Sequence, residues 1–280
     1  MRLILLTALT MTAFAANSVL NRLAVDGRYS DPGSFAVVRV LAGAVVLTLL
    51  VLARGGHMPL RSRRRVLGAG ALALYMIGFS LAYRTLDAGL GALVLFGVVQ
   101  MTMFTASAVT GTRATLPQIG GALLAFAGLV WILWPGDAAA VDPVGATLMI
   151  VAGIGWAIYS LVGRTEPDAL AATAANFCLA LPLTFFAPLI AGTALTLTPP
   201  GLALACLSGA VTSGLGYALW YRILPDLTPS VAATIQLSVP VIALAGGLIL
   251  LGETASLRFL TGALVVLSGI ALSLHKARSG

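Results

Sequence analysis

Long stretches without a charged residue are the feature that most constrains this chain. They cover residues 3–21, 40–53, 66–83, 88–112, 114–136, 143–163, 169–221, 227–252 and 259–275. A helix needs about 20 apolar residues to cross a hydrocarbon core about 30 Å thick, and most of the runs have that length. The run 40–53 reaches it when extended back through Arg39, and 169–221 suffices for two crossings divided at Pro199-Pro200. We therefore expect an all-α integral membrane protein with ten transmembrane helices.

The composition is typical of a chain embedded in a lipid bilayer. Charged residues make up 9% of it, against about 25% in soluble domains, and the mean hydropathy is +1.03. A folded chain with so few charged residues cannot present a surface that water solvates well. Ten spans of about 20 residues leave no room for a soluble domain among 280 residues, so any activity must lie inside the helical bundle.

The basic residues predict how the chain is oriented. With a cytoplasmic N-terminus, eleven of them fall on the inner side and four on the outer side. The inner ones are Arg2, Arg54, Arg61, Arg63, Arg64, Arg65, Arg113, Arg164, Arg222, Lys276 and Arg278, and the outer ones are Arg22, Arg28, Arg84 and Arg258. This positive-inside bias predicts a multi-pass protein of a bacterial-type inner (plasma) membrane with both termini cytoplasmic. Topology accounts for the net charge of +7, so we expect membrane lipid and a small-molecule solute as partners, and no nucleic acid. The oligomeric state stays open, and a monomer is compatible with the sequence.

The chain repeats itself. Residues 115–134 and 256–274 share the pattern GALxxxxG, so that Gly121 matches Gly262 and Gly128 matches Gly269. Earlier matches follow in the same order: Ser18, Arg22, Phe35, Tyr83 and Arg84 with Ser160, Arg164, Phe177, Tyr221 and Arg222. We therefore expect two five-helix repeats, residues 1–137 and 138–280. Because five is odd, the second copy enters the membrane inverted, and inverted repeats are the physical basis of alternating access in carriers.

The doubled GALxxxxG and the segment 227–253, LTPSVAATIQLSVPVIALAGGLILLGE, resemble the ten-helix, EamA-like members of the drug/metabolite transporter superfamily. The patterns GFSLAY at 78–83 and GWAIYS at 155–160 are most similar to YddG-type exporters of aromatic amino acids. The resemblance implies secondary transport, with a substrate cavity between spans 1, 3, 4, 6, 8 and 9. Span four departs from the pattern, since Gln100 or Met101 stands where the second half has Pro240.

Polar and aromatic residues at helical spacing mark candidate solute contacts on six spans. An unpartnered polar group in lipid is costly, so mid-span polar residues should face the bundle, and neighbours on one helix face are three or four positions apart. The candidates are Asn17, Asn21, Phe79, Tyr83, Phe96, Gln100, Trp156, Tyr159, Tyr217, Trp220 and Gln236. Trp156 is the strongest of them. Phe79 and Phe96 are also compatible with plain packing, and the amides with helix-to-helix hydrogen bonds worth about 0.6 kcal/mol.

Pro240 is a candidate hinge in span nine. Proline removes a backbone donor and frees a carbonyl one turn earlier, so we expect a kink there. No metal ion or cofactor is expected.

The placement of charges narrows the substrate. No carboxylate falls at a predicted midplane, which argues against lipophilic cations, and no Arg or Lys is expected there, which argues against phosphorylated solutes. Arg39 is expected near the outer end of span two, where it pairs with Glu253 or snorkels to the interface. Zwitterionic amino acids with aromatic or other apolar side chains are the preferred solutes, moved by an exporter or uniporter. Drugs, nucleobases and uncharged metabolites are the alternative.

Other functional classes fit less well. His57 and His275 fall in a loop or at a helix end, and the sequence contains no HExxH, GxSxG or metal-ligand cluster. A membrane enzyme is therefore disfavoured, and a receptor or channel is a minor alternative.

Overall fold

The computed structural model of the chain describes residues 2–109, 116–134, 141–163, 166–192, 195–223, 235–236 and 238–273. These residues are helical apart from short connections and an isolated β-bridge between Ser30 and Leu197. The helices are α1 (Arg2–Asp26), α2 (Pro32–Ala53), α3 (Arg63–Ala82), α4 (Ala88–Val109), α5 (Leu116–Leu133), α6 (Pro143–Gly163), α7 (Ala169–Thr184), α8 (Ala187–Ala191), α9 (Pro199–Leu207), the π-helix η1 (Ser208–Leu215), α10 (Gly216–Ile223), α12 (Ser238–Leu250) and α13 (Leu257–Ser273). The all-helical prediction is confirmed for the described residues.

Six described helices are long and apolar enough to cross a membrane. They are Arg2–Asp26, Pro32–Ala53, Arg63–Ala82, Leu116–Leu133, Pro143–Gly163 and the continuous stretch Pro199–Trp220. Four shorter apolar helices accompany them, at Ala88–Met103, Ala169–Thr184, Ser238–Leu250 and Leu257–Leu272. The stretch that begins at Pro199-Pro200 is separate from α7, as the paired prolines predict.

Several helices begin at residues whose side chains cap the helix N-terminus. Asp31 accepts a hydrogen bond from the backbone N–H of Ser34 at 2.9 Å, and Pro32 follows it in the first turn of α2. Ser62 caps α3, Asp168 caps α7 and Thr198 caps α9 in the same way. Such side chains satisfy amides that a helix leaves unpaired, so these short polar segments fix where the helices start.

Polar contacts tie the helix ends together at two opposite ends of the bundle. At the first, here the Arg22 end, Arg22 donates to the carbonyl of Tyr83 at 3.0 Å and lies 3.5 Å from Glu253. Thr85 donates to Asp142 at 2.9 Å beside it. At this end lie the helix-connecting segments 27–31, 83–87, 141–142 and 251–256.

At the second, here the Arg65 end, Arg65 forms an ion pair with Glu166 and donates to the carbonyl of Ala172 at 3.1 Å. Arg54 forms an ion pair with Asp168 nearby. These contacts join the end of α2 and the start of α3 to the segment between α6 and α7 and to the start of α7.

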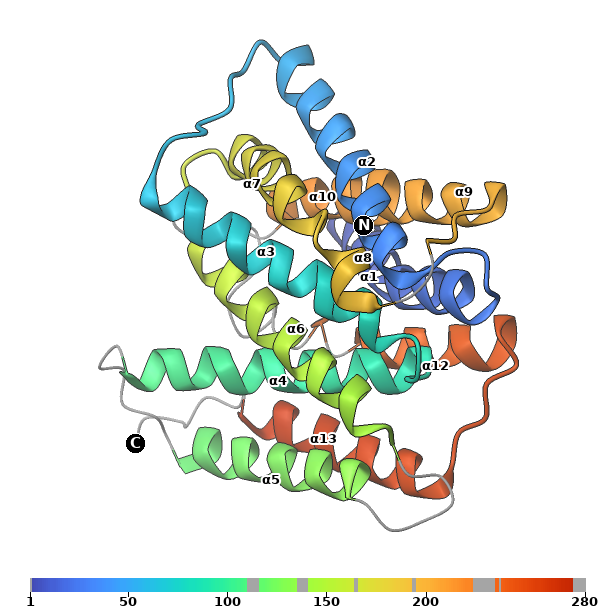
Figure 1. Ribbon diagram of the computed structural model, residues 1–280. Coiled ribbons are helices and arrows are strands. Elements are labelled where there is room, and N and C mark those ends of the chain that lie inside the picture. Colours follow the sequence, from blue (N-terminus) through green and yellow to red (C-terminus); the bar gives the residue numbers. More distant parts are fainter. Residues whose placement is uncertain are drawn as a thin grey trace.

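The centre of the bundle receives side chains from α1, α2, α3, α4, α6, α7, η1 and α10, while α5 and α13 pack as a pair at one edge, next to α4 (Figure 1). Glycines bring that pair close. A Cβ at Gly128 would lie 3.1 Å from the carbonyl oxygen of Gly262, and one at Gly269 would lie 2.6 Å from that of Gly121. The glycines of the doubled GALxxxxG therefore form the contact between α5 and α13 in a reciprocal manner, as small residues do between membrane helices.

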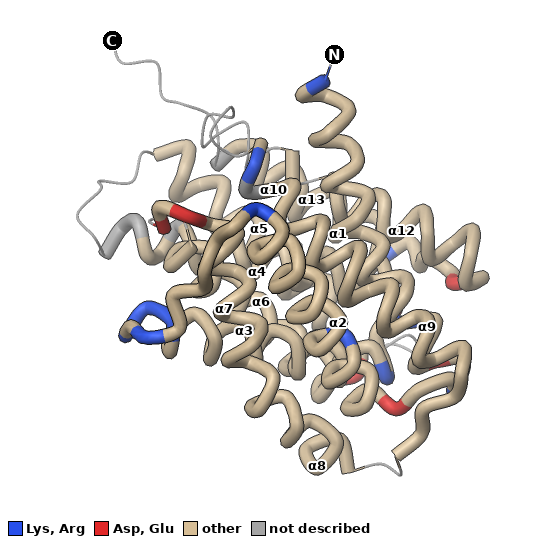
Figure 2. Tube along the Cα trace, turned by 90° about the horizontal axis from the view of Figure 1, so that it is seen from above, with Lys and Arg blue, Asp and Glu red and all other residues tan. Residues whose placement is uncertain are grey.

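The outside of the bundle is strongly apolar. Charged residues gather mostly at helix ends and connections, and the lengths of the helices between them are nearly free of charge (Figure 2). Large apolar side chains such as Leu5, Leu49 and Phe126 are more than half exposed there. Such a surface fits hydrocarbon rather than water.

Candidate functional site

Aromatic rings surround Trp156 at the centre of the bundle. Its ring centroid lies 4.9 Å from that of Tyr217, 5.0 Å from Tyr75, 5.6 Å from Tyr159 and 6.0 Å from Phe14. All five side chains are buried, and they come from α1, α3, α6 and α10. Tilted and edge-to-face arrangements at these distances are the favourable ones for aromatic pairs.

The cluster extends along α3 and toward α7. Phe79 lies 5.3 Å from Tyr75, and Tyr83 lies 4.8 Å from Phe79, because residues four apart share one face of α3. We call the following set the aromatic cluster: Phe14, Tyr75, Phe79, Tyr83, Trp156, Tyr159, Phe177, Tyr217 and Trp220.

A small cavity lies within this cluster. Its volume is about 10 Å³, and its lining consists of Phe14, Asn17, Ser18, Tyr75, Phe79, Leu95, Phe96, Trp156 and Tyr217. A space of this size holds at most about one water molecule. We call it the central cavity. The structure thus shows the cluster closed around its centre.

Hydrogen-bonding side chains line one side of the cluster. The Oδ1 atom of Asn17 accepts from Ser208 at 2.8 Å, Thr212 at 2.5 Å and Ser213 at 3.2 Å. The three hydroxyl donors belong to η1, in the middle of the span Pro199–Trp220. A π-helical turn in mid-span is rare and often marks a functional position. Here it turns these hydroxyls toward α1.

Arg39 also points into this centre, which corrects the sequence-based expectation for it. Its side chain is fully buried, with Nε donating to Ser213 Oγ at 3.1 Å and Nη2 donating to Tyr75 Oη at 3.1 Å. Its guanidinium carbon lies 4.8 Å from the ring centroid of Phe79. Arg39 neither snorkels nor pairs with Glu253, which contacts Arg22 instead. The expectation that no arginine is central was wrong, because depth along a helix does not fix which way a long side chain turns.

The structure brings together most of the residues selected from sequence. Asn17, Phe79, Phe96, Trp156 and Tyr217 line the central cavity. A second set, Tyr83, Tyr159 and Trp220, belongs to the aromatic cluster, and Asn21 is buried with its Nδ2 donating to Ser80 at 2.9 Å.

Three selected residues lie elsewhere or are less engaged. Gln100 and Gln236 are half-buried and do not line the central cavity. Pro240 is buried in the first turn of α12 as described, where a missing N–H costs little. The hinge at Pro240 stays a prediction.

Sequence reasoning missed three rings of the cluster and the role of Arg39. Tyr75 lies four residues before Phe79, and Phe14 lies three before Asn17, so extending the helical spacing by one turn finds both. Phe177 matches Phe35 in the repeat, which gives no hint of a site.

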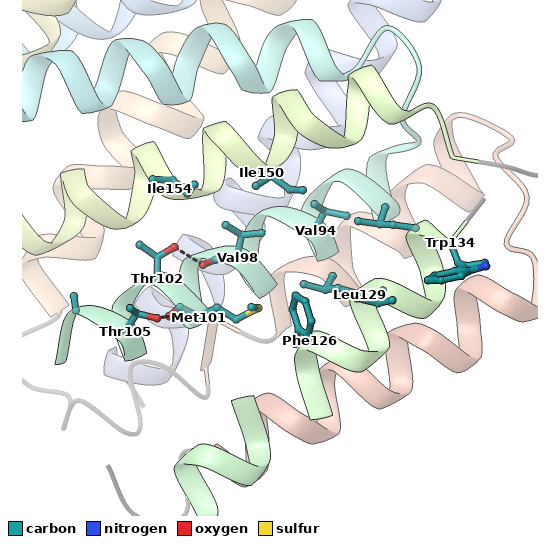
Figure 3. A pocket seen from close by; sticks show the side chains of 13 residues that line it. Val94, Val98, Met101, Thr102, Thr105, Phe126, Leu129, Trp134, Ile150 and Ile154 are labelled. Atoms are coloured by element: carbon teal, nitrogen blue, oxygen red, sulfur yellow. Dashed lines mark hydrogen bonds between the residues drawn. The ribbon is translucent and has the colours of Figure 1, made fainter. Parts of the chain in front are cut away.

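A larger cavity lies between α4, α5 and α6. Its volume is about 910 Å³, and we call it the α4–α5–α6 groove (Figure 3). Its lining is Val94, Val98, Met101, Thr102, Thr105, Ala106, Phe126, Leu129, Val130, Leu133, Trp134, Ile150 and Ile154. The two hydroxyls among these residues donate to carbonyls of their own helix, Thr102 to Val98 at 2.8 Å and Thr105 to Met101 at 2.9 Å. The groove therefore offers a ligand an almost purely apolar wall.

Some of the carboxyl groups at the two ends have shifted pKa values. Burial raises the pKa of Glu253, opposed by the backbone N–H of Ala88 and by Arg22. Burial likewise raises the pKa of Asp87. The hydrogen bond from Arg54 lowers the pKa of Asp168, at the Arg65 end. Within the described residues, no three His, Cys, Asp or Glu side chains are grouped to hold a metal ion.

Fold and site together define an all-helical membrane protein with an enclosed aromatic centre. The sequence model of the EamA-like transporter family matches residues 1–134 and 143–275. The chain therefore belongs to the EamA-like transporter family, which is a family of membrane transporters.

Individual relatives span nearly the whole chain. An uncharacterized protein of Pseudomonas aeruginosa is 46% identical over 98% of this chain and 94% of its own. An uncharacterized transporter of Bacillus subtilis, YvbV, is 24% identical over 99% of this chain and 93% of its own. A crystal structure of a protein shares the fold, with a TM-score of 0.68 at 18% identity over 96% of this chain and 97% of the other.

Proposed function

We propose that the chain is a secondary transporter that moves amphipathic solutes of no net charge, aromatic and other apolar amino acids, across the inner membrane by alternating access. The observation that carries this proposal is the closed aromatic cluster around Trp156, with Asn17 and the hydroxyls of η1 beside it. Aromatic walls bury flat apolar groups well, and a few convergent polar groups can orient a zwitterion. The segments that resemble YddG-type exporters contribute Phe79, Tyr83, Trp156 and Tyr159 to this cluster.

The helix contacts support a ten-helix architecture of two inverted repeats, residues 1–137 and 138–280. An inverted repeat requires contacts to come in related pairs. The packing of α3 on α6 has its counterpart in α10 and η1 on α1, and α4 on α6 has its counterpart in α12 on α1. The pairs α2 with α7, α4 with α12 and α5 with α13 relate to themselves. The two stretches that match the family model support the same division.

The polar contacts of the two ends support alternating access. Arg22 and Glu253 hold α1 to the end of α12 at the Arg22 end, while Arg65 and Glu166 hold α3 to the segment after α6 at the Arg65 end. A carrier must open one set while it keeps the other. In this proposal the Arg65 end is cytoplasmic, as the positive-inside bias predicts, and Pro240 acts as a hinge of α12.

Counterflow in proteoliposomes tests the proposal. Purified protein is loaded with unlabelled solute, and uptake of labelled tryptophan, methionine, uracil or a quaternary ammonium ion is followed. Exchange of tryptophan and methionine is the expected result. Preference for uracil supports the nucleobase alternative, and preference for the quaternary ammonium ion supports drug efflux. Absence of any exchange contradicts a carrier, and dependence on an imposed pH gradient contradicts a simple uniporter.

A further inference from the structure

Arg39 brings a full positive charge into the aromatic cluster. Its side chain is fully buried. Among the residues that the structure describes, no carboxylate lies within ion-pair distance of it. An uncompensated charge away from water is costly, and an ionisable residue inside a membrane bundle marks a function by default.

The hydrogen bonds of Arg39 leave part of its donor set unused. Nε donates to Ser213 and Nη2 donates to Tyr75, and both acceptors are neutral hydroxyls. Nη1 is buried and has no hydrogen-bond partner within the described part of the chain. A guanidinium presents five N–H donors in a planar fork that matches the geometry of a carboxylate.

The guanidinium also lies against the wall of the central cavity. Its central carbon is 4.8 Å from the ring centroid of Phe79 and 5.5 Å from that of Tyr75, and both rings line the cavity. The rings stabilise the cation through their faces, but they are weak substitutes for an anion. Arg39 does not itself line the cavity in this closed structure, so a carboxylate in the cavity reaches Nη1 when the rings of Tyr75 and Phe79 move apart as the centre opens.

We propose that Arg39 binds the carboxylate of the transported solute through Nη1. This inference rests on the proposed function and changes it in one respect, because a carboxylate becomes the requirement for recognition whether or not an ammonium group balances its charge. Amino acids and aryl carboxylates then bind, while nucleobases and amines without a carboxylate are rejected. The solute supplies the counter-charge that the described residues lack, so closure of the cluster around a carboxylate is more favourable than closure around a neutral analogue.

Three ligands that share an indole ring test the proposal. Tryptophan has a carboxylate and an ammonium group, tryptophanamide lacks the carboxylate, and 3-indolepropionate lacks the ammonium group. Their affinities for the purified full chain in detergent are measured by calorimetry. We expect tryptophan and 3-indolepropionate to bind at least about tenfold more tightly than tryptophanamide. Equal affinity for tryptophan and tryptophanamide, or no binding of either carboxylate, overturns the proposal.

Substitution of Arg39 separates ligand binding from a purely structural role. In Arg39→Gln we expect the two carboxylates to lose at least about tenfold in affinity and tryptophanamide to lose none. Arg39→Lys keeps the charge without the fork, so it should retain part of the preference. If Arg39 only joins α2 to α3 and η1, all three ligands weaken equally, and that result contradicts the proposal.

Arg65→Gln is the matched control. Arg65 is equally buried, but it has Glu166 as its counter-ion and donates to the carbonyl of Ala172. Its loss should leave the ratio of tryptophan to tryptophanamide affinity unchanged. Should Arg39→Gln fail to fold, the wild-type ligand series and Arg39→Lys still decide the question.

The counterflow assay keeps this inference distinct from the proposed function. Carboxylate-selective binding without exchange of any labelled solute contradicts transport and leaves the role of Arg39 standing. Exchange of solutes irrespective of a carboxylate contradicts the role of Arg39 and leaves transport standing.

Discussion

The α4–α5–α6 groove is far larger than the central cavity, yet the central cavity is the better candidate for binding a solute. The groove measures about 910 Å³ and the central cavity about 10 Å³. In the groove the hydroxyls of Thr102 and Thr105 are occupied by their own helix, whereas in the centre Nη1 of Arg39 has no partner in the described part of the chain. Recognition needs convergent polar groups as well as apolar wall. A wide apolar groove on the outside of a membrane bundle suits lipid chains, whereas a closed centre that opens in turn is what a carrier needs.

Removing one aromatic ring at each place gives the largest expected contrast. Trp156→Ala deletes the ring that four others contact, so we expect tryptophan counterflow to fall by about thirtyfold or more, as for a binding hot spot of about 2 kcal/mol. Phe126→Ala in the half-exposed wall of the groove should leave the rate within about twofold. Rates are compared at equal amounts of reconstituted protein.

Trp156→Phe is the control for a loss of transport that comes only from unfolding. A buried Trp→Ala change costs about 3–5 kcal/mol of stability, while the phenyl ring keeps most of the packing. If transport by Trp156→Ala is normal, or if Phe126→Ala is equally damaging, the centre is not the solute site.

Glycines of the α5–α13 pair sharpen the comparison by separating scaffold from site. A Cβ at Gly269 would lie 2.4 Å from the backbone nitrogen of Ala125, so Gly269→Ala should push α13 from α5 and cost about 1–3 kcal/mol of stability. Gly120→Ala is the control, because none of the residues that the structure describes lies within 4 Å of its added Cβ. Thermal unfolding in detergent should show a lower midpoint for the first and an equal or higher one for the second, with tryptophan affinity unchanged in both. Equal midpoints would refute the close α5–α13 contact.

Part of this comparison could be predicted from the sequence. Charge spacing predicts the helices, and one-face spacing selects Asn17, Phe79, Phe96, Trp156 and Tyr217, which the fold brings to one cavity. Spacing works here because a helix converts three or four positions into one face.

The direction of Arg39 could not be predicted, because the turn of its long side chain depends on partners from α3 and η1. The π-helical turn of η1 could not be predicted either, because its sequence, SGAVTSGL, has no pattern that indicates a π-helix rather than an α-helix. The α4–α5–α6 groove likewise depends on how three helices pack.

Two hydroxyls provide a smaller test of the same contrast. Ser213 accepts from Arg39 and donates to Asn17, so Ser213→Ala leaves the buried Nε of Arg39 without its acceptor. We expect a loss of about 1 kcal/mol, or about fivefold in tryptophan affinity. Thr102→Val in the groove removes a hydroxyl that donates to the carbonyl of Val98 in its own helix, and should change affinity by less than about twofold. Calorimetry measures both, and equal effects would argue against the positioning role of Ser213.

The smallest expected effect is the dependence of transport on pH. It arises because the centre has to open, whereas the groove is already open. Burial raises the pKa of Glu253 in the structure closed at the Arg22 end, relative to a state in which that end is open to water. The closed state therefore takes up a proton more readily, so closure is favoured at acidic pH and that preference is lost as the pH rises through the raised pKa.

With equal pH on both sides of the membrane, we expect tryptophan counterflow to slow on acidification by less than about fivefold. Glu253→Gln should flatten this dependence, because it removes the titrating group while it keeps an oxygen for the N–H of Ala88. Asp168→Asn at the Arg65 end is the control. Since the hydrogen bond from Arg54 lowers the pKa of Asp168, its contribution is lost only at more acidic pH, and this variant should keep the wild-type profile. An unchanged profile in Glu253→Gln would show that Glu253 is not the group whose protonation slows exchange.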